Sequence, residues 1–133
     1  MLGTILVVDD DHDIRDIVRL VLSREGYGVL TAPDGHSAME LMTSLENAEK
    51  VCTVVCDLEM PNGSGTELID YFRLHHPTIP IIVLSGSPDP KFLDGILQQG
   101  VCDWIRKPAT RENLLQKVRT AANLFTLRKQ QGA

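Results

Sequence analysis

The sequence has no long hydrophobic run, few cysteines and no surplus of basic residues. None of its apolar stretches reaches the roughly 18 residues that a membrane-spanning helix requires. The start of the chain leads directly into a strand-like segment and lacks the charge pattern of a signal peptide. The 13 basic residues against 18 acidic ones give a net charge of −5, which argues against a nucleic-acid-binding surface in this segment. These absences predict a cytoplasmic protein with no membrane contact and no direct nucleic-acid binding.

The cysteine content does not suit a disulfide framework. Cys52, Cys56 and Cys102 are an odd number, and all three lie in apolar segments. We therefore expect reduced thiols in the core. Cys52 and Cys56 are four residues apart, so a metal-binding pair is the alternative, but small core side chains are the favoured interpretation.

The chain has the length of a single domain. Its 133 residues can bury one hydrophobic core, and they contain no internal repeat or low-complexity stretch. We expect residues 1–128 to form the domain. The polar residues 129–133 are expected to form a flexible tail or the start of a linker to a possible output module.

Apolar runs typical of strands alternate with segments of helical periodicity. The runs are rich in Val and Ile, as strands buried on both faces are. They comprise Thr4–Val8, Gly28–Thr31, Val51–Cys56, Pro80–Leu84 and Val101–Ile105. Strands that alternate with helices form right-handed βαβ units, so the sequence predicts an α/β fold with a parallel sheet and helices on both faces.

Several segments between the strands carry signals for helix ends. Asp89-Pro90 is a typical helix start, and the last and longest helix is expected to begin near Thr110. The segment Ser44–Lys50 is long and charged for a connection, and it is interpreted as one extra helical turn or a surface loop. It is not expected to mark a domain boundary.

The least apolar runs, 28–31 and 101–105, are expected at the edges of the sheet. This placement is compatible with a doubly wound five-stranded parallel sheet of strand order 2-1-3-4-5, the flavodoxin-like class. In that class the ligand site lies at the carboxyl ends of strands 1 and 3.

Polar groups follow four of the five predicted strands. They are Asp9-Asp10-Asp11, Asp57, Ser85-Gly86-Ser87 and Lys107-Pro108. Because the carboxyl ends of parallel strands share one edge of a sheet, we expect these groups to converge on a single crevice.

The aspartates at this edge are candidate metal ligands. Asp9, Asp10 and Asp57 would repel one another unless a cation joins them. Oxygen ligands without histidine or cysteine suit a hard ion such as Mg²⁺, which typically binds one or two carboxylates and keeps several waters. Asp11 and Asp13 are interpreted instead as caps of the first helix.

The other strand-end groups suit phosphate chemistry. A carboxylate can act as a nucleophile and form an aspartyl phosphate. Phosphoryl transfer has a highly charged transition state, so its catalysis consists mainly of positioning and charge neutralisation. The Lys107 ammonium and Mg²⁺ would neutralise that charge, and the Ser85 hydroxyl would donate a hydrogen bond to a phosphoryl oxygen. Pro108 would stiffen the turn that directs Lys107.

Four segments resemble one known family in both residues and order. They are Leu6-Val7-Val8-Asp9-Asp10, the run Val55–Gly65, Ile81-Ile82-Val83-Leu84-Ser85-Gly86 and Trp104-Ile105-Arg106-Lys107-Pro108. The chain resembles the receiver domains of bacterial two-component response regulators, of the chemotaxis-regulator type, from Ile5 to about Phe125. The run Val55–Gly65 is the most specific, because the acid, the Met-Pro turn and the Gly-x-Gly arrive in the order typical of the family.

The resemblance implies a ligand set for the metal ion. Asp57 would be the phosphoacceptor and a metal ligand, and Asp10 would bind the ion directly. Asp9 would hold the ion through water, and the backbone carbonyl of Glu59 would complete the protein's share. The ion would be Mg²⁺, for which Mn²⁺ can substitute.

The resemblance also implies a switch. Ser85 and Lys107 match the hydroxyl residue and the lysine that contact the phosphoryl group. Trp104 stands where the family usually carries Tyr, Phe or His, an aromatic that turns inward on phosphorylation. The larger indole is either crowded or locked in that position, or it belongs to a partner-binding surface. Glu59 and Ser87 flank the path of the hydrolytic water and are expected to tune the lifetime of the signal.

The implied function is a phosphorylation-dependent signalling switch. A sensor histidine kinase or a phosphotransfer protein would donate the phosphoryl group from a phosphohistidine, and the domain would catalyse only its own phosphorylation and dephosphorylation. The helix that starts at Asp89, strand 101–105 and the last helix would form a face that repacks. This face would then bind an output domain or protein, or form a homodimer.

Three other interpretations remain open. A haloacid-dehalogenase-type phosphatase would use Asp9 as its nucleophile, but no paired acidic motif follows Lys107 and the chain leaves little room for a substrate-binding cap. A flavodoxin-like flavin or nucleotide binder needs a Gly, Ser or Thr loop after the first strand, where this chain has three aspartates. A pseudo-receiver would serve only as an interaction module, which the complete set of site residues argues against.

Overall fold

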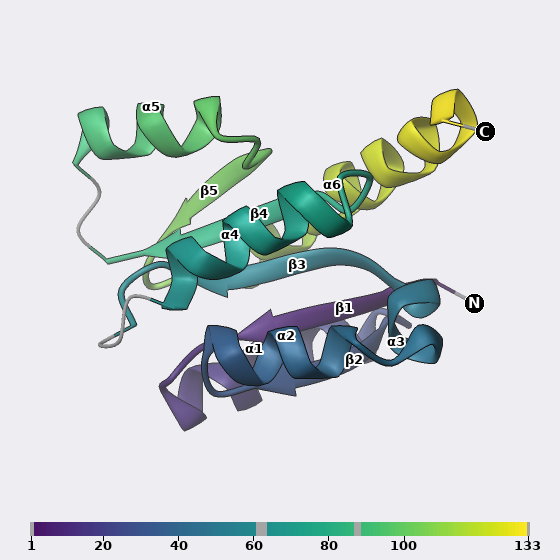
Figure 1. The fold of residues 1–133 in the computed structure, drawn as a ribbon. Coiled ribbons are helices and arrows are strands. Elements are labelled where there is room, and N and C mark those ends of the chain that lie inside the picture. Colours follow the sequence, from purple (N-terminus) through teal and green to yellow (C-terminus); the bar gives the residue numbers. More distant parts are fainter. Residues whose placement is uncertain (1, 61–63, 87–88, 133) are drawn as a thin grey trace.

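A sheet of five parallel strands forms the centre of the molecule. The computed structural model describes residues 2–60, 64–86 and 89–132. The strands are β1 (Thr4–Val8), β2 (Gly28–Ala32), β3 (Val51–Asp57), β4 (Ile81–Ser85) and β5 (Asp103–Arg106). Their order is β2-β1-β3-β4-β5, so β3 is central and β2 and β5 are the edges (Figure 1). The predicted doubly wound sheet of order 2-1-3-4-5 is confirmed.

Helices connect the strands and begin where the sequence signals them. They are α1 (His12–Arg24), α2 (Gly35–Met42), α3 (Leu45–Lys50), α4 (Ser64–His75), α5 (Pro90–Gln98) and α6 (Arg111–Gly132). The Asp11 carboxylate caps α1 by accepting hydrogen bonds from the backbone N–H groups of Asp13 and Ile14. Asp89 caps α5, and Pro90 occupies its first turn. The predicted start of α5 and the capping role of Asp11 are therefore confirmed.

Successive strand residues are buried on opposite faces of the sheet. Leu6 and Val54 belong to the core cluster that includes residues of α2, α4 and α5, whereas Ile5 and Val55 belong to the cluster that includes residues of α1 and α6. All four side chains are fully buried. Figure 1 shows α2 and α4 crossing one face of the sheet. Because both faces are covered, the strands are continuous apolar runs and not alternating ones.

The segment between α2 and β3 forms a helix of its own. The Ser44 hydroxyl caps α3 by accepting a hydrogen bond from the backbone N–H of Asn47, and Ala48 packs against the core. Helix α3 leads directly into β3. Of the two interpretations of this segment, the extra helical turn is confirmed.

The last described residues of the chain are helical. Helix α6 continues to Gly132 and so includes residues 129–132, which were expected as a flexible tail or the start of a linker. Residues 127–131 are Leu, Arg, Lys and Gln, which favour helix and include no helix breaker. The Lys129 ammonium also lies 5.3 Å from the centre of the Phe125 ring. Among the described residues, no helix is long and apolar enough to cross a membrane.

The register of the sheet brings the polar strand ends to one edge. Val8 of β1 pairs with Cys56 of β3, and Asp57 pairs with Leu84 of β4. Ser85, in turn, pairs with Arg106 of β5. The groups that follow β1, β3, β4 and β5 therefore leave the sheet side by side.

Candidate functional site

An acidic cluster lies at the carboxyl edge of the sheet. The carboxylates of Asp9, Asp10 and Asp57 each offer an oxygen within 4.8 Å of the others. Asp9 and Asp57 are 0% and 1% exposed, whereas Asp10 faces solvent. The structure thus brings together the three acids that the sequence predicts as metal ligands.

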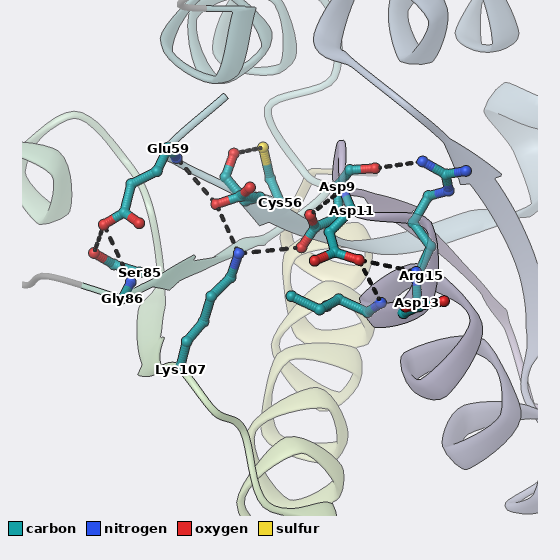
Figure 2. Close-up of polar contacts among 11 residues, drawn as sticks. Asp9, Asp11, Asp13, Arg15, Cys56, Glu59, Ser85, Gly86 and Lys107 are labelled. Carbon is teal, nitrogen blue, oxygen red and sulfur yellow. Dashed lines mark hydrogen bonds and ion pairs between the residues drawn. The ribbon is translucent and has the colours of Figure 1, made fainter. Parts of the chain in front are cut away.

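Asp9 is held in place by its own turn and by α1. Its Oδ1 accepts a hydrogen bond of 2.9 Å from the backbone N–H of Asp11. The guanidinium of Arg15 donates a 2.8 Å hydrogen bond to the Asp9 carbonyl oxygen (Figure 2). Arg15 therefore orients the turn that carries Asp9 and Asp10. Sequence reasoning missed it, because nothing in the sequence separates Arg15 from the other polar residues of α1.

Lys107 joins the two buried acids. Its Nζ lies 3.2 Å from Oδ1 of Asp57 and 3.3 Å from Oδ2 of Asp9 (Figure 2). The Lys107 backbone N–H donates to the Ser85 carbonyl at 2.8 Å, and the peptide bond to Pro108 is cis. Burial lowers the pKa of Lys107, but the carboxylates of Asp57 and Asp9 outweigh it and raise that pKa above its ordinary value. The ammonium is therefore charged at neutral pH.

Asp57 remains short of positive charge despite this contact. Burial, together with the charge of Asp9, raises the pKa of its carboxyl to about 6. The 3.0 Å hydrogen bond from the Glu59 backbone N–H to Asp57 Oδ1 and the Lys107 ammonium both oppose that increase. One ammonium does not balance the carboxylates gathered here.

The cluster has the properties of a cation site. All of the side-chain atoms that this cluster offers as metal ligands are carboxylate oxygens, which suit a small hard ion. Within the described part of the chain, the buried Oδ2 of Asp9 accepts no hydrogen bond, and its partner there is the Lys107 ammonium. The residues present therefore fit a divalent cation.

The Glu59 side chain contacts the end of β4. Its Oε1 accepts a 2.8 Å hydrogen bond from the Ser85 hydroxyl and a 3.1 Å hydrogen bond from the Gly86 backbone N–H (Figure 2). The Ser85 residue is 2% exposed. Sequence reasoning placed Glu59 beside the site but missed this contact, which depends on how two loops lie in space.

Trp104, the predicted switch aromatic, lies on β5. It is half-buried there, packs against the core and lines a small cavity with Pro90, Leu93 and Asp94 of α5. Ser87 lies outside the described residues.

Comparison with known proteins agrees with this geometry. The family model of the response regulator receiver domain matches residues 5–119. The chain belongs to this family. It is a receiver domain of two-component signalling, a class of domain that responds to phosphorylation and interacts with kinases and output domains.

Individual relatives support the assignment. The receiver domain is 39% identical over 117 residues to the CAI-1 autoinducer sensor kinase/phosphatase CqsS of Vibrio cholerae, covering 86% of this chain and 16% of that protein. It is 36% identical over 115 residues to the response regulator MprA of Mycolicibacterium vanbaalenii, covering 86% of this chain and 48% of the relative. The chain thus spans less than half the length of either relative.

A solved structure shows the same fold. A response regulator receiver domain protein from Clostridium thermocellum superposes with a TM-score of 0.87 at 28% identity. The match covers 95% of this chain and 98% of the other. The likeness to this receiver extends over nearly the whole of both chains.

Proposed function

We propose that this receiver domain accepts a phosphoryl group on Asp57 from the phosphohistidine of a sensor histidine kinase or a phosphotransfer protein. The observation that carries the proposal is the buried Asp57 carboxylate, 3.2 Å from the Lys107 ammonium and grouped with Asp9 and Asp10. In the transfer, a carboxylate oxygen of Asp57 forms a bond to phosphorus while the bond between phosphorus and the histidine nitrogen breaks. The histidine leaves with its electron pair.

The acidic cluster would hold Mg²⁺, or Mn²⁺ in its place. Asp10, Asp57 and the backbone carbonyl of Glu59 would bind the ion directly, and Asp9 would bind it through water. When bound, the ion would neutralise charge that develops on the phosphoryl oxygens. Lys107 would neutralise charge from the other side, and Ser85 would donate a hydrogen bond to a phosphoryl oxygen.

Phosphorylation would change the surface that partners contact. The phosphoryl group adds about −1.5 to −2 charges, and new hydrogen bonds to it would draw in the loop after β4. The face made of α5, β5 and α6, which includes Trp104, would repack. An output domain or protein would read this change, and the same face would form a homodimer. Glu59 and Ser87 would set the lifetime of the phosphorylated state.

Locating the phosphoryl group tests the proposal. The protein is incubated with acetyl phosphate and Mg²⁺, and the labelled peptide is identified by mass spectrometry. We expect label on Asp57 that depends on the metal ion. Label on Asp9 would support a phosphatase of the haloacid-dehalogenase type instead. No label and no Mg²⁺ binding would leave only an interaction module.

Arg15→Met is expected to weaken Mg²⁺ binding by about tenfold, because residues that orient metal ligands commonly affect affinity by that order. The substitution removes the guanidinium that donates to the Asp9 carbonyl. Calorimetric titration with Mg²⁺ measures the change. Arg19→Met is the control, because Arg19 lies on the same helix and faces Asp16, 3.7 Å away. Equal Mg²⁺ affinity in the two variants would contradict a positioning role for Arg15.

A further inference from the structure

The Glu59 carboxylate occupies two hydrogen-bond donors at the end of β4. The Ser85 hydroxyl and the Gly86 backbone N–H both donate to the same oxygen, Oε1, at 2.8 and 3.1 Å. Two donors that converge on one anionic oxygen form the kind of contact that also binds a phosphoryl oxygen. This part of the site therefore already holds an anion supplied by the chain itself.

The backbone places this carboxylate beside the phosphoacceptor. Glu59 follows Asp57 by two residues, and its backbone N–H donates to Asp57 Oδ1. Asp57 pairs with Leu84, the residue before Ser85, in the sheet. Glu59 thus links the acid at the end of β3 to the donors at the end of β4, as Figure 2 shows for its contacts with Ser85 and Gly86.

Position 86 leaves room for the carboxylate. A β carbon added to Gly86 would lie 3.3 Å from Glu59 Oε2, closer than most such contacts in proteins. A side chain at position 86 would require the Glu59 carboxylate to shift by a few tenths of an ångström. The Glu59 carboxylate therefore packs closely against the Gly86 backbone.

We propose that the Glu59 carboxylate is an internal competitor for the phosphoryl group, which must displace it to reach Ser85 and Gly86. The inference rests on the proposed transfer to Asp57. A phosphoryl group brings about −1.5 to −2 charges and three acceptor oxygens next to these donors. Two anions cannot share them without strong repulsion, so Glu59 swings toward solvent, where its exposed side chain is readily hydrated. The residue thereby lowers the affinity of the site for a phosphoryl group. In the unphosphorylated state it also holds Ser85 and Gly86 at the end of β4.

Affinity for beryllofluoride, a mimic of a phosphoryl group on a carboxylate, measures this competition. We compare wild type, Glu59→Gln and Glu59→Asp by calorimetry with saturating Mg²⁺. Gln keeps the length but loses the charge, whereas Asp keeps the charge but is one methylene too short to reach Ser85. We expect both variants to bind about tenfold more tightly than wild type, because each loses a charge-assisted contact that the free state makes.

The control removes the same charge elsewhere. Glu49 is exposed on α3, which precedes β3 and so lies at the opposite end of that strand from Asp57. Glu49→Gln is expected to bind beryllofluoride as wild type does. If Glu59→Asp matches wild type while Glu59→Gln binds more tightly, the charge acts through space and competition for the donors is excluded.

The remaining outcomes separate this inference from the proposed function. Equal affinity in wild type and both Glu59 variants would overturn the competition but leave phosphoryl acceptance by Asp57 intact. No binding by any of the proteins would overturn both. Binding by the Glu59 variants alone would support an internal competitor that is stronger than expected.

Discussion

Asp57→Asn is expected to abolish acceptance of a phosphoryl group and to stabilise the metal-free receiver domain above about pH 6. Asn has nearly the shape of Asp but no nucleophilic carboxylate, so acetyl phosphate with Mg²⁺ should leave the variant unlabelled. The stabilisation has a separate cause. The folded protein raises the pKa of Asp57 to about 6, chiefly through burial, so the fold disfavours the charged carboxylate.

The sign of the pH dependence follows from this shift. Between about pH 4 and the folded pKa of about 6, the folded state binds more protons at Asp57 than the unfolded state, so stability falls as the pH rises. The side chain at this position of the Asp57→Asn variant has no carboxyl group, so it does not titrate in this range. The free-energy difference should be small near pH 4 and reach the order of 3 kcal/mol above pH 6, at about 1.4 kcal/mol for each pKa unit.

Urea unfolding across this pH range, with EDTA present, measures the difference. Asp70→Asn is the control, because Asp70 is an exposed residue of α4. This control variant should accept the phosphoryl label as wild type does. Its free energy of unfolding should also vary with pH as that of wild type does. A constant free-energy difference between wild type and Asp57→Asn from pH 4 to 7 would contradict a raised pKa at Asp57.

Lys107→Met is expected to destabilise the metal-free receiver domain by about 3 kcal/mol at neutral pH, because it leaves two buried carboxylates without their cation. The Lys107 ammonium lies within 3.3 Å of Asp9 and 3.2 Å of Asp57. Mg²⁺ should restore much of the loss, since it brings positive charge to the same acids. The stabilisation by Mg²⁺ should therefore be larger in the variant than in wild type.

Chemical unfolding with and without Mg²⁺ measures both effects. Lys117→Met is the matched control, because Lys117 makes a partly exposed ion pair of 2.8 Å with Asp103. Such pairs contribute about 0–1 kcal/mol. Adding Asp57→Asn to Lys107→Met should recover part of the stability, because one buried charge is removed. Equal losses in the two lysine variants would show that Lys107 does not hold the acidic cluster together.

The internal contact of Glu59 changes how the predicted site is understood. Sequence reasoning treated Glu59 as a metal ligand through its carbonyl and as a modulator of water, and both roles stay predictions. The structure adds a contact of its side chain with Ser85 and Gly86. Ser85 is therefore engaged before any phosphoryl group arrives. In the proposed transfer to Asp57, its hydroxyl would exchange the Glu59 carboxylate for a phosphoryl oxygen.

The strand ends explain why so much of the site was predictable. Asp9, Asp57, Ser85 and Lys107 each lie at or directly after a strand. In a parallel sheet the carboxyl ends must meet at one edge, so knowing the strands places these residues together without any knowledge of loops. The helix caps at Asp11 and Asp89 were predictable for a similar reason, because capping depends on only a few neighbouring residues.

Local pattern is weak in two segments. The residues after Arg128, expected as a flexible tail or the start of a linker, are helical through Gly132, because Lys and Gln favour helix once a long helix is already formed. The segment Ser44–Lys50 allowed two interpretations, and the packing of Ala48 against the core accompanies the helical one.

The sequence by itself determined the alternation of strands and helices, the carboxyl edge that carries the site and the acids, lysine and serine found there, because hydrophobic period and strand-end position follow from neighbouring residues alone. Only the tertiary structure decided that Arg15 holds the Asp9 carbonyl, that Lys107 reaches both buried acids and that Glu59 already binds Ser85. These contacts join residues of different elements. Their geometry depends on loop paths and side-chain rotamers that are set by packing, which no local pattern records.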